Sequence, residues 1–158
     1  MTEGPCDFHR VPQLTEGTMS VNSLHDVRWI DFPSKKDSRG ILTSIEVGVD
    51  TPFEVKRVFY CHHITTDRGG HAHRDTDQIV IGVAGRLKMD LSDGTKTRTF
   101  ELNDPCRGIY LPRMLYISLY DFSSEAVGLV LANTHYDISR SIRSWDDYLK
   151  AIKVHDDA

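Results

Sequence analysis

The chain has 158 residues, of which 39% are hydrophobic and 27% charged, a composition that predicts a folded globular domain. Nineteen Lys and Arg against 23 Asp and Glu leave a net charge of −4, so no basic surplus exists to hold a nucleic acid. The longest apolar stretch, residues 126–132, is far shorter than the about 20 residues that span a bilayer. We therefore expect neither a nucleic-acid partner nor a membrane span.

The first 26 residues are polar and lack periodicity, and we interpret them as a flexible leader before a single domain over residues 27–158. The leader shows no basic region followed by an apolar region, as a secretory signal would. The three cysteines, Cys6, Cys61 and Cys106, lack the spacing of a disulfide framework or a zinc knuckle. These observations predict a cytoplasmic protein with unpaired thiols.

Short apolar runs separated by turn residues follow the leader and predict β-strands. The runs cover residues 27–32, 41–47, 53–64, 78–83, 86–91, 96–102, 108–111, 116–122 and 126–133. Ser92-Asp93-Gly94 lies between two alternating runs and is a strong hairpin signal. Strands that recur about every 8–12 residues favour an all-β sandwich, jelly roll or barrel.

Only the C-terminal end of the chain reads as a helix. Ser144 precedes two acidic residues in the way of a helix N-cap. The apolar stripe that follows has helical spacing and consists of Trp145, Tyr148, Leu149 and Ile152. We expect a short helix that packs on the outside or the end of the β structure.

The segment 68–78, which reads RGGHAHRDTDQ, carries the most informative pattern in the chain. On an extended strand His71 and His73 are two residues apart, so both imidazoles project from the same face. A single histidine in such a strand would more often be a hydrogen-bonded structural residue. A same-face pair after a Gly-Gly turn, with Arg68 beside it, favours a functional site.

A metal ion is one use for two histidines, and the rest of the pattern argues against it. The H-x-H-x4-(E/Q)-x6-G pattern is typical of the cupin superfamily, in which metal-binding members add a glutamate and a third histidine. Here Gln78 stands at the glutamate position, and alignment on Pro112 puts Ile117 at the third histidine. Two imidazoles and an amide are a poor donor set for a divalent cation. We expect no metal and no cofactor.

Without a metal, two adjacent histidines can serve as an acid and a base. Their ordinary pKa near 6.5 suits proton transfer at neutral pH, and a charged ring disfavours a charge on its neighbour. Such a pair fits removal of a proton next to a ketone and return of a proton to the adjacent carbon. Arg68 could bind an anionic group or an enediolate oxygen, or could be a solvated surface side chain.

Over residues 28–152 the sequence resembles the dTDP-4-keto-6-deoxyglucose 3,4-ketoisomerases, which are WxcM-like members of the cupin superfamily. The central block 68–78 is similar to the family's RG-x-HAH-(K/R)-x-x-x-Q motif, and residues 108–112 (GIYLP) are similar to its G-(L/I)-Y-x-P segment. Flanking similarity follows in the family's order at residues 37–42, 53–60, 121–123, 130–132 and 136–143.

The resemblance implies a cupin double-stranded β-helix, an all-β jelly roll with a short C-terminal helix. It implies a cofactor-independent isomerase of deoxysugar biosynthesis that moves a keto group from C4 to C3 of a dTDP-linked 4-keto-6-deoxyhexose through an enediol. The products of such enzymes usually go on to cell-surface polysaccharides such as O-antigen, or to antibiotic sugars. His71 and His73 match the catalytic pair. The positions expected to face the substrate are Arg39, Arg57, Arg68, Gln78, Tyr110, Tyr116 and Ile117.

The resemblance also implies a homodimer in which an N-terminal strand pairs with the partner chain, which would cover exposed strand edges. One departure matters, because the family commonly has a Trp-His pair where this chain has Tyr116-Ile117. Two alternatives therefore stay open: a nucleotide-sugar-binding cupin without activity, and a metal-dependent cupin oxygenase. A 3,5-epimerase is disfavoured because its His–Asp base and Tyr acid have no counterpart here.

Overall fold

The computed structural model describes residues 23–156, and within them two five-stranded antiparallel sheets face each other. In hydrogen-bonded order, the first sheet contains β1 (Arg28–Asp31), β9 (Arg107–Leu111), β6 (Gln78–Ala84), β11 (Val127–Ala132) and β4 (Arg57–Cys61). The second contains β12 (Ser141–Ile142), β5 (Arg68–His73), β10 (Tyr116–Tyr120), β7 (Leu87–Ser92) and β8 (Thr97–Leu102). This architecture confirms the predicted all-β jelly roll.

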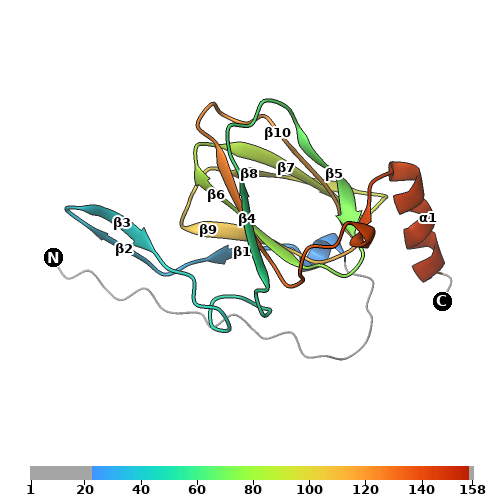
Figure 1. The fold of residues 1–158 in the computed structure, drawn as a ribbon, viewed down its shortest axis with the longest axis horizontal. Helices are drawn as coiled ribbons and strands as arrows, with labels where there is room; N and C mark the ends of the chain where they lie inside the picture. The colour runs from blue at the N-terminus through green and yellow to red at the C-terminus, as the bar shows by residue number, and fades with distance from the viewer. Residues whose placement is uncertain (1–22, 157–158) are drawn as a thin grey trace.

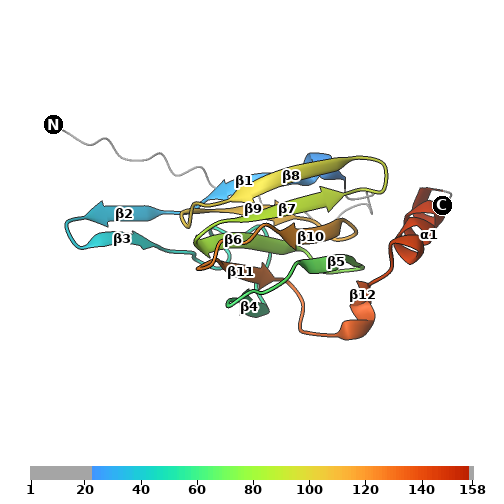
Figure 2. The ribbon, with the colours of Figure 1, turned by 90° about the horizontal axis from the view of Figure 1, so that it is seen from above.

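A third, two-stranded sheet of β2 (Ser34–Asp37) and β3 (Gly40–Thr43) projects away from the barrel, at the end opposite to the C-terminal helix (Figures 1 and 2). The sequence predicted one strand over residues 41–47 here, and the structure corrects it to a hairpin. The error arose because the Ser-Lys-Lys-Asp sequence of β2 has no apolar residue, and all four of its residues are exposed. Because a projecting hairpin buries neither face, its strands do not need to alternate apolar and polar residues, and the sequence lacks that strand signal.

The core between the two sheets comes from the inward-facing residues of each strand. In β7, Leu87, Met89 and Leu91 are fully buried and alternate with half-buried Lys88 and Asp90, as the sequence pattern predicted. The β7–β8 hairpin turns at Gly94, whose φ of +94° few other residues tolerate. A Cβ there would also lie 2.3 Å from Ile152 Cδ1, so this turn packs directly against the helix.

Helix α1 (Trp145–Asp156) lies outside the second sheet, as expected (Figure 2). Its first turn is capped by Ser144, whose hydroxyl accepts from the Asp147 N–H at 3.3 Å. Tyr148 is fully buried and donates its hydroxyl to the carbonyls of Ser92 and Met114. Among the described helices, none is long and apolar enough to cross a membrane.

Most of the expected polar leader, residues 1–22, lies outside the described residues. Its last part belongs to the folded unit, because Leu24–Asp26 form a short 3₁₀ helix, η1, and Leu24 is buried in the main core. The Ser23 hydroxyl caps this helix by accepting from the His25 N–H, and the Asp26 carboxylate accepts from the Ser23 N–H.

Candidate active site

A cavity of about 470 Å³ lies between the two sheets and is lined by residues of both. Its floor is apolar and includes Val80, Leu87, Ile117, Leu119, Phe122 and Val130. Its walls carry the polar side chains that the sequence singled out, together with several that it did not. A cavity that joins an apolar floor to a few convergent polar groups is the usual form of a small-molecule site.

His71 and His73 project into this cavity from β5, as the spacing of two predicted. Ala72 between them faces the other way, where it is fully buried near Tyr148 of α1. The preceding Gly69 has a φ of +88°, and a Cβ there would lie 2.7 Å from the Ile117 carbonyl oxygen of β10. The glycine therefore allows the close approach of β5 to β10 beside the register shift that follows Ile117.

The two rings are in direct contact. His71 Nε2 lies 3.1 Å from His73 Nε2, and the rings meet nearly edge to face, with their centroids 4.8 Å apart. Burial, the His71 ring and the charge of Arg57 together lower the pKa of His73 to about 4. Burial also lowers the pKa of His71. At neutral pH both rings are therefore uncharged, and an unprotonated ring nitrogen is available to accept a proton.

Two neighbours hold His73 in place. The Gln78 amide nitrogen lies 3.3 Å from His73 Nε2, and the Ser141 hydroxyl lies 3.4 Å from His73 Nδ1. Ser141 is on β12, directly opposite His73 in the β5–β12 ladder. Gln78 is almost fully buried, with 3% of its surface exposed. Every polar atom of the His73 ring therefore has a protein partner.

Arginines supply positive charge to the cavity wall. Arg57, Arg68 and Arg143 all line the cavity, and no ion pair joins any of them to a described carboxylate. The Arg57 guanidinium lies over the rings of Phe59 and Tyr136, at 5.0 Å and 5.4 Å from their centroids. Its Nε is buried and has no hydrogen-bond partner among the described residues. A buried donor without a partner next to an open cavity fits an anionic ligand.

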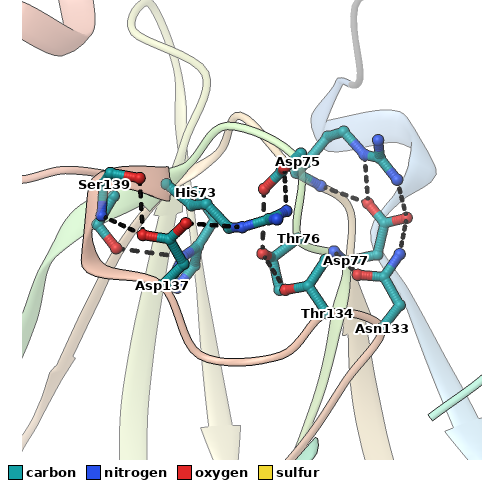
Figure 3. Close-up of polar contacts among 11 residues, drawn as sticks. His73, Asp75, Thr76, Asp77, Asn133, Thr134, Asp137 and Ser139 are labelled. Carbon is teal, nitrogen blue, oxygen red and sulfur yellow. Dashed lines mark hydrogen bonds and ion pairs between the residues drawn. The ribbon is translucent and has the colours of Figure 1, made fainter. Parts of the chain in front are cut away.

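Residues 133–140, which we call the rim segment, connect β11 to β12 and cover one side of the cavity. Asn133 donates to the Asp77 carboxylate and also accepts from the Asp77 N–H, while the hydroxyls of Thr134 and Thr76 lie 2.7 Å apart (Figure 3). Asp137 caps the 3₁₀ helix η2 (Ile138–Arg140) by accepting from the Ser139 N–H. The bonds of Asn133 and Thr134 attach the rim segment to the loop that follows β5.

Two ion pairs hold the same loop. Arg113 binds Asp77 through two parallel bonds of 3.0 Å and 2.8 Å, and the Asp77 carboxylate is 9% exposed. Arg140 of the rim segment pairs with Asp75, two residues beyond His73. No role of the rim segment was predicted from the sequence, because its contacts join residues up to 65 positions apart and follow no local period.

The structure brings most of the predicted site residues together. His71, His73, Arg57, Arg68, Gln78 and Ile117 all line the cavity. Ile117 is opposite His71 in the β5–β10 ladder and 4% exposed, so an apolar side chain does occupy the position of the third cupin histidine. Cavity residues that sequence reasoning missed include Phe59, Thr134, His135, Tyr136 and Arg143.

Tyr110, Tyr116 and Arg39 do not line this cavity, so their expected contact with the substrate stays a prediction. Tyr110 faces away from the barrel interior, because its neighbours Ile109 and Leu111 occupy the inward positions of β9. Tyr116 similarly points to α1, where it contacts the rings of Trp145 and Tyr148. Arg39 is at the exposed β2–β3 turn and pairs with Asp37.

The donors at the cupin metal position do not fit a divalent cation. Beside the two imidazoles, Gln78 presents its amide nitrogen, which has no lone pair for a metal, and no group of three or more His, Cys, Asp or Glu side chains among the described residues could hold a metal ion. Ile117 contributes no donor at all. We therefore assign no step of the chemistry to a metal.

The chain matches the family model FdtA, described as WxcM-like, C-terminal, over residues 25–153. It is 35% identical over 125 residues to the TDP-4-oxo-6-deoxy-alpha-D-glucose-3,4-oxoisomerase of Aneurinibacillus thermoaerophilus, with 78% of this chain and 90% of that protein covered.

Solved structures of 3,4-ketoisomerases are also similar to this chain. QdtA, a sugar 3,4-ketoisomerase from Thermoanaerobacterium thermosaccharolyticum in complex with TDP, matches with a TM-score of 0.81 and 35% identity, over 84% of this chain and 98% of QdtA. A 3,4-ketoisomerase from Helicobacter canadensis matches with a TM-score of 0.78 and 32% identity, over 81% and 98% of the two chains. A mutant of QdtA was solved in complex with TDP-4-keto-6-deoxyglucose.

Proposed function

The chain belongs to the FdtA, WxcM-like family, and from this membership we propose that it is a dTDP-sugar 3,4-ketoisomerase of deoxysugar biosynthesis. It converts dTDP-4-keto-6-deoxy-D-glucose to a dTDP-3-keto-6-deoxyhexose. The observation that carries the chemistry is the pair of imidazoles whose Nε2 atoms lie 3.1 Å apart on the wall of the cavity.

In the first half of the reaction, His73 is the base. Its Nε2 takes the proton from C3 of the sugar, and the electrons of the C3–H bond form a C3=C4 double bond. The electron pair of the C4 carbonyl moves onto O4, which receives a proton from His71 Nε2, so an enediol forms. His73 suits the role of base because its low pKa keeps it unprotonated at neutral pH.

The second half reverses these roles on the neighbouring atoms. The O3 hydroxyl returns its proton to His71 Nε2, and the electrons of that O–H bond form the new carbonyl at C3. The electron pair of the C3=C4 bond takes the proton of His73 at C4. Each histidine ends as it began, and no atom or electron is gained or lost, so the reaction needs no cofactor.

The arginines of the cavity wall bind the anionic part of the substrate. A nucleoside diphosphate carries its charge on phosphate oxygens, and guanidinium groups bind these with several hydrogen bonds at once. Arg57 is the best-placed group, because its buried Nε has no protein partner and Phe59 and Tyr136 hold its plane. Arg68 and Arg143 extend the positive wall on the side of β5 and β12.

We also propose that the protein is a homodimer with exchanged N-terminal strands. The β2–β3 hairpin exposes Ile41 and Leu42 at 58% and 68%, and the edge strand β4 exposes Val58 and Tyr60 at 57% and 63%. Exposed apolar residues on strands that have one unpaired edge favour pairing with another chain. Because Arg39 does not line its own cavity, it would bind substrate only by reaching the site of the partner. Leu42→Glu should then convert the dimer to a monomer in sedimentation.

A cytoplasmic location is part of the same proposal. Within the described residues Cys61 and Cys106 are both free thiols, as a reducing compartment favours. The product is an activated ketosugar, and we expect it to supply a later step of polysaccharide or O-antigen synthesis in the same compartment.

The direct test is to incubate the chelator-treated protein with dTDP-4-keto-6-deoxyglucose and to follow the sugar by ¹³C NMR. We expect the carbonyl signal to move from C4 to C3. Tight dTDP binding with an unchanged sugar would instead identify a binding protein without activity. Activity that disappears with chelation and returns with iron or manganese would revive the metal-dependent alternative.

A further inference from the structure

Three residues in the floor of the cavity offer a ligand only aliphatic surface. Val80 of β6, Ile117 of β10 and Val130 of β11 all line the cavity, and they are 1%, 4% and 5% exposed. Val80 has ladder partners in β9 and β11, and Val130 has them in β4 and β6, so their N–H and C=O groups are taken up by the sheet. We call these three residues the aliphatic floor.

The aliphatic floor begins directly beside the histidine pair. Ile117 is opposite His71 in the β5–β10 ladder. Val80 follows Gln78 by two residues on the same face of β6, and the Gln78 amide nitrogen lies 3.3 Å from His73 Nε2. A group bound at the histidines therefore has aliphatic side chains as its next neighbours on two strands.

The lining groups change in chemistry with depth. The arginines Arg68 and Arg143 are exposed, the two histidines are half-buried, and the aliphatic floor is buried. A ligand that extends from the mouth to the bottom therefore meets positive charge first, then the imidazoles, and then an apolar surface without hydrogen-bonding groups.

The proposed substrate has its groups in the same order. Its diphosphate is attached to C1 of the sugar, C4 lies across the pyranose ring from C1, and C5 carries C6 next to C4. With the diphosphate at the arginines and with C3 and C4 at the histidines, C6 extends toward the bottom of the cavity. In a 6-deoxy sugar C6 is a methyl group, whereas in an ordinary hexose it carries a hydroxyl.

We propose that the aliphatic floor of Val80, Ile117 and Val130 binds the C6 methyl group and selects 6-deoxy sugars against sugars with a 6-hydroxyl. A methyl group gains from burial against this surface, and a hydroxyl would lose its water without finding a partner. This inference rests on the proposed function and identifies the residues that recognise one part of the substrate.

The experiment is isothermal titration of the wild type with dTDP-6-deoxyglucose, dTDP-glucose and dTDP-xylose. These sugars differ only at C6, which is a methyl group, a hydroxymethyl group and absent, and none has a keto group, so the test needs no turnover. We expect dTDP-6-deoxyglucose to bind best, dTDP-xylose about 4-fold more weakly and dTDP-glucose about 10–100-fold more weakly.

The outcomes separate this inference from the proposed function. Equal affinity for dTDP-6-deoxyglucose and dTDP-glucose would overturn the inference and leave the proposed function standing. Selective binding by a protein that turns over no ketosugar would support the inference and count against the proposed function. If neither dTDP nor any of the three sugars binds, both are overturned.

Val130→Thr tests the floor itself, because the two side chains have nearly the same shape and threonine adds a hydroxyl. The new hydroxyl can pair with a 6-hydroxyl, so the preference for dTDP-6-deoxyglucose over dTDP-glucose should fall below about 3-fold. Val27→Thr is the matched control, because Val27 belongs to the same core cluster and is 4% exposed but does not line the cavity. It should keep the wild-type preference.

A second variant keeps the test independent of the folding of the first. Ile117→Thr places a hydroxyl at the other side of the aliphatic floor and should lower the preference in the same direction. A wild-type preference in a folded Val130→Thr or Ile117→Thr protein would contradict the proposal, and so would an equal loss of preference in Val27→Thr.

Discussion

His73 Nε2 lies 3.1 Å from His71 Nε2, closer than two charged imidazoles can stay. The contact makes the proton affinity of each ring depend on the other, and Arg57 adds a further positive charge near His73. The pair is consequently held free of charge at neutral pH. An uncharged base and a hydrogen-bond donor therefore lie next to each other, where they can act on neighbouring atoms of the sugar.

The pH dependence of kcat/KM should reflect this low proton affinity. Burial, His71 and Arg57 lower the pKa of His73 to about 4, and burial lowers the pKa of His71, so both rings protonate below their ordinary pKa of 6.5. We expect kcat/KM to stay level as the pH falls from 8 to about 6 and to decline only in more acidic buffer. A decline centred at or above pH 6.5 would contradict the account.

Unfolding should show the same depressed pKa with a defined sign. Between pH 6.5 and about 4 the unfolded His73 binds a proton and the folded one does not, so the free energy of unfolding falls as the pH falls through this window. The loss should be on the order of 2 kcal/mol and absent above pH 7. Urea titrations of the wild type and of His73→Asn measure it, and an identical slope in the two proteins would count against the assignment.

Arg57 should contribute to binding of the nucleotide sugar more than to folding. Arg57→Met keeps much of the packing on Phe59 and Tyr136 but removes the charge, so KM and the Kd for dTDP should rise by about 10–100-fold. Arg98→Met is the matched control, because Arg98 also stacks on an aromatic ring, that of Phe100, but does not line the cavity. Isothermal titration with dTDP would contradict the prediction if both variants bound alike.

The ion pair between Asp77 and Arg113 should be important for stability. Asp77 is nearly buried and binds Arg113 through two bonds, so Asp77→Ala leaves the guanidinium without its partner and should lower the free energy of unfolding by about 3 kcal/mol. The pair of Asp31 and Arg107 gives the control, because the Asp31 side chain is 82% exposed and Asp31→Ala should cost less than about 1 kcal/mol. Equal losses in urea titrations would show that burial of the pair does not matter.

The strand that carries the histidines was predictable, because the spacing of two in His71-Ala-His73 fixes their common face. The alignment on Pro112 predicted Ile117 at the place of the third cupin histidine, and in the structure Ile117 lines the cavity and lies opposite His71 in the β5–β10 ladder. In both cases a local period or a fixed offset determines where the side chain points.

Tyr110 and Tyr116 show where this reasoning fails. Both lie on strands that are covered on both sides, by the barrel interior on one and by Phe53 or helix α1 on the other. Apolar residues on both faces hide which face meets the cavity. The rim segment escaped prediction for a different reason, since bonds such as Asn133 to Asp77 join residues far apart in sequence.

The central claim is that His73 removes the proton from C3 of the sugar, and the incorporation of solvent deuterium measures this step directly. In D₂O, the metal-free wild type should exchange the C3 hydrogen of dTDP-4-keto-6-deoxyglucose and build deuterium into C4 of the product. His73→Asn should slow both by at least about 100-fold while still binding dTDP, and His25→Asn, outside the cavity, should behave as the wild type. Undiminished exchange in His73→Asn would contradict the account.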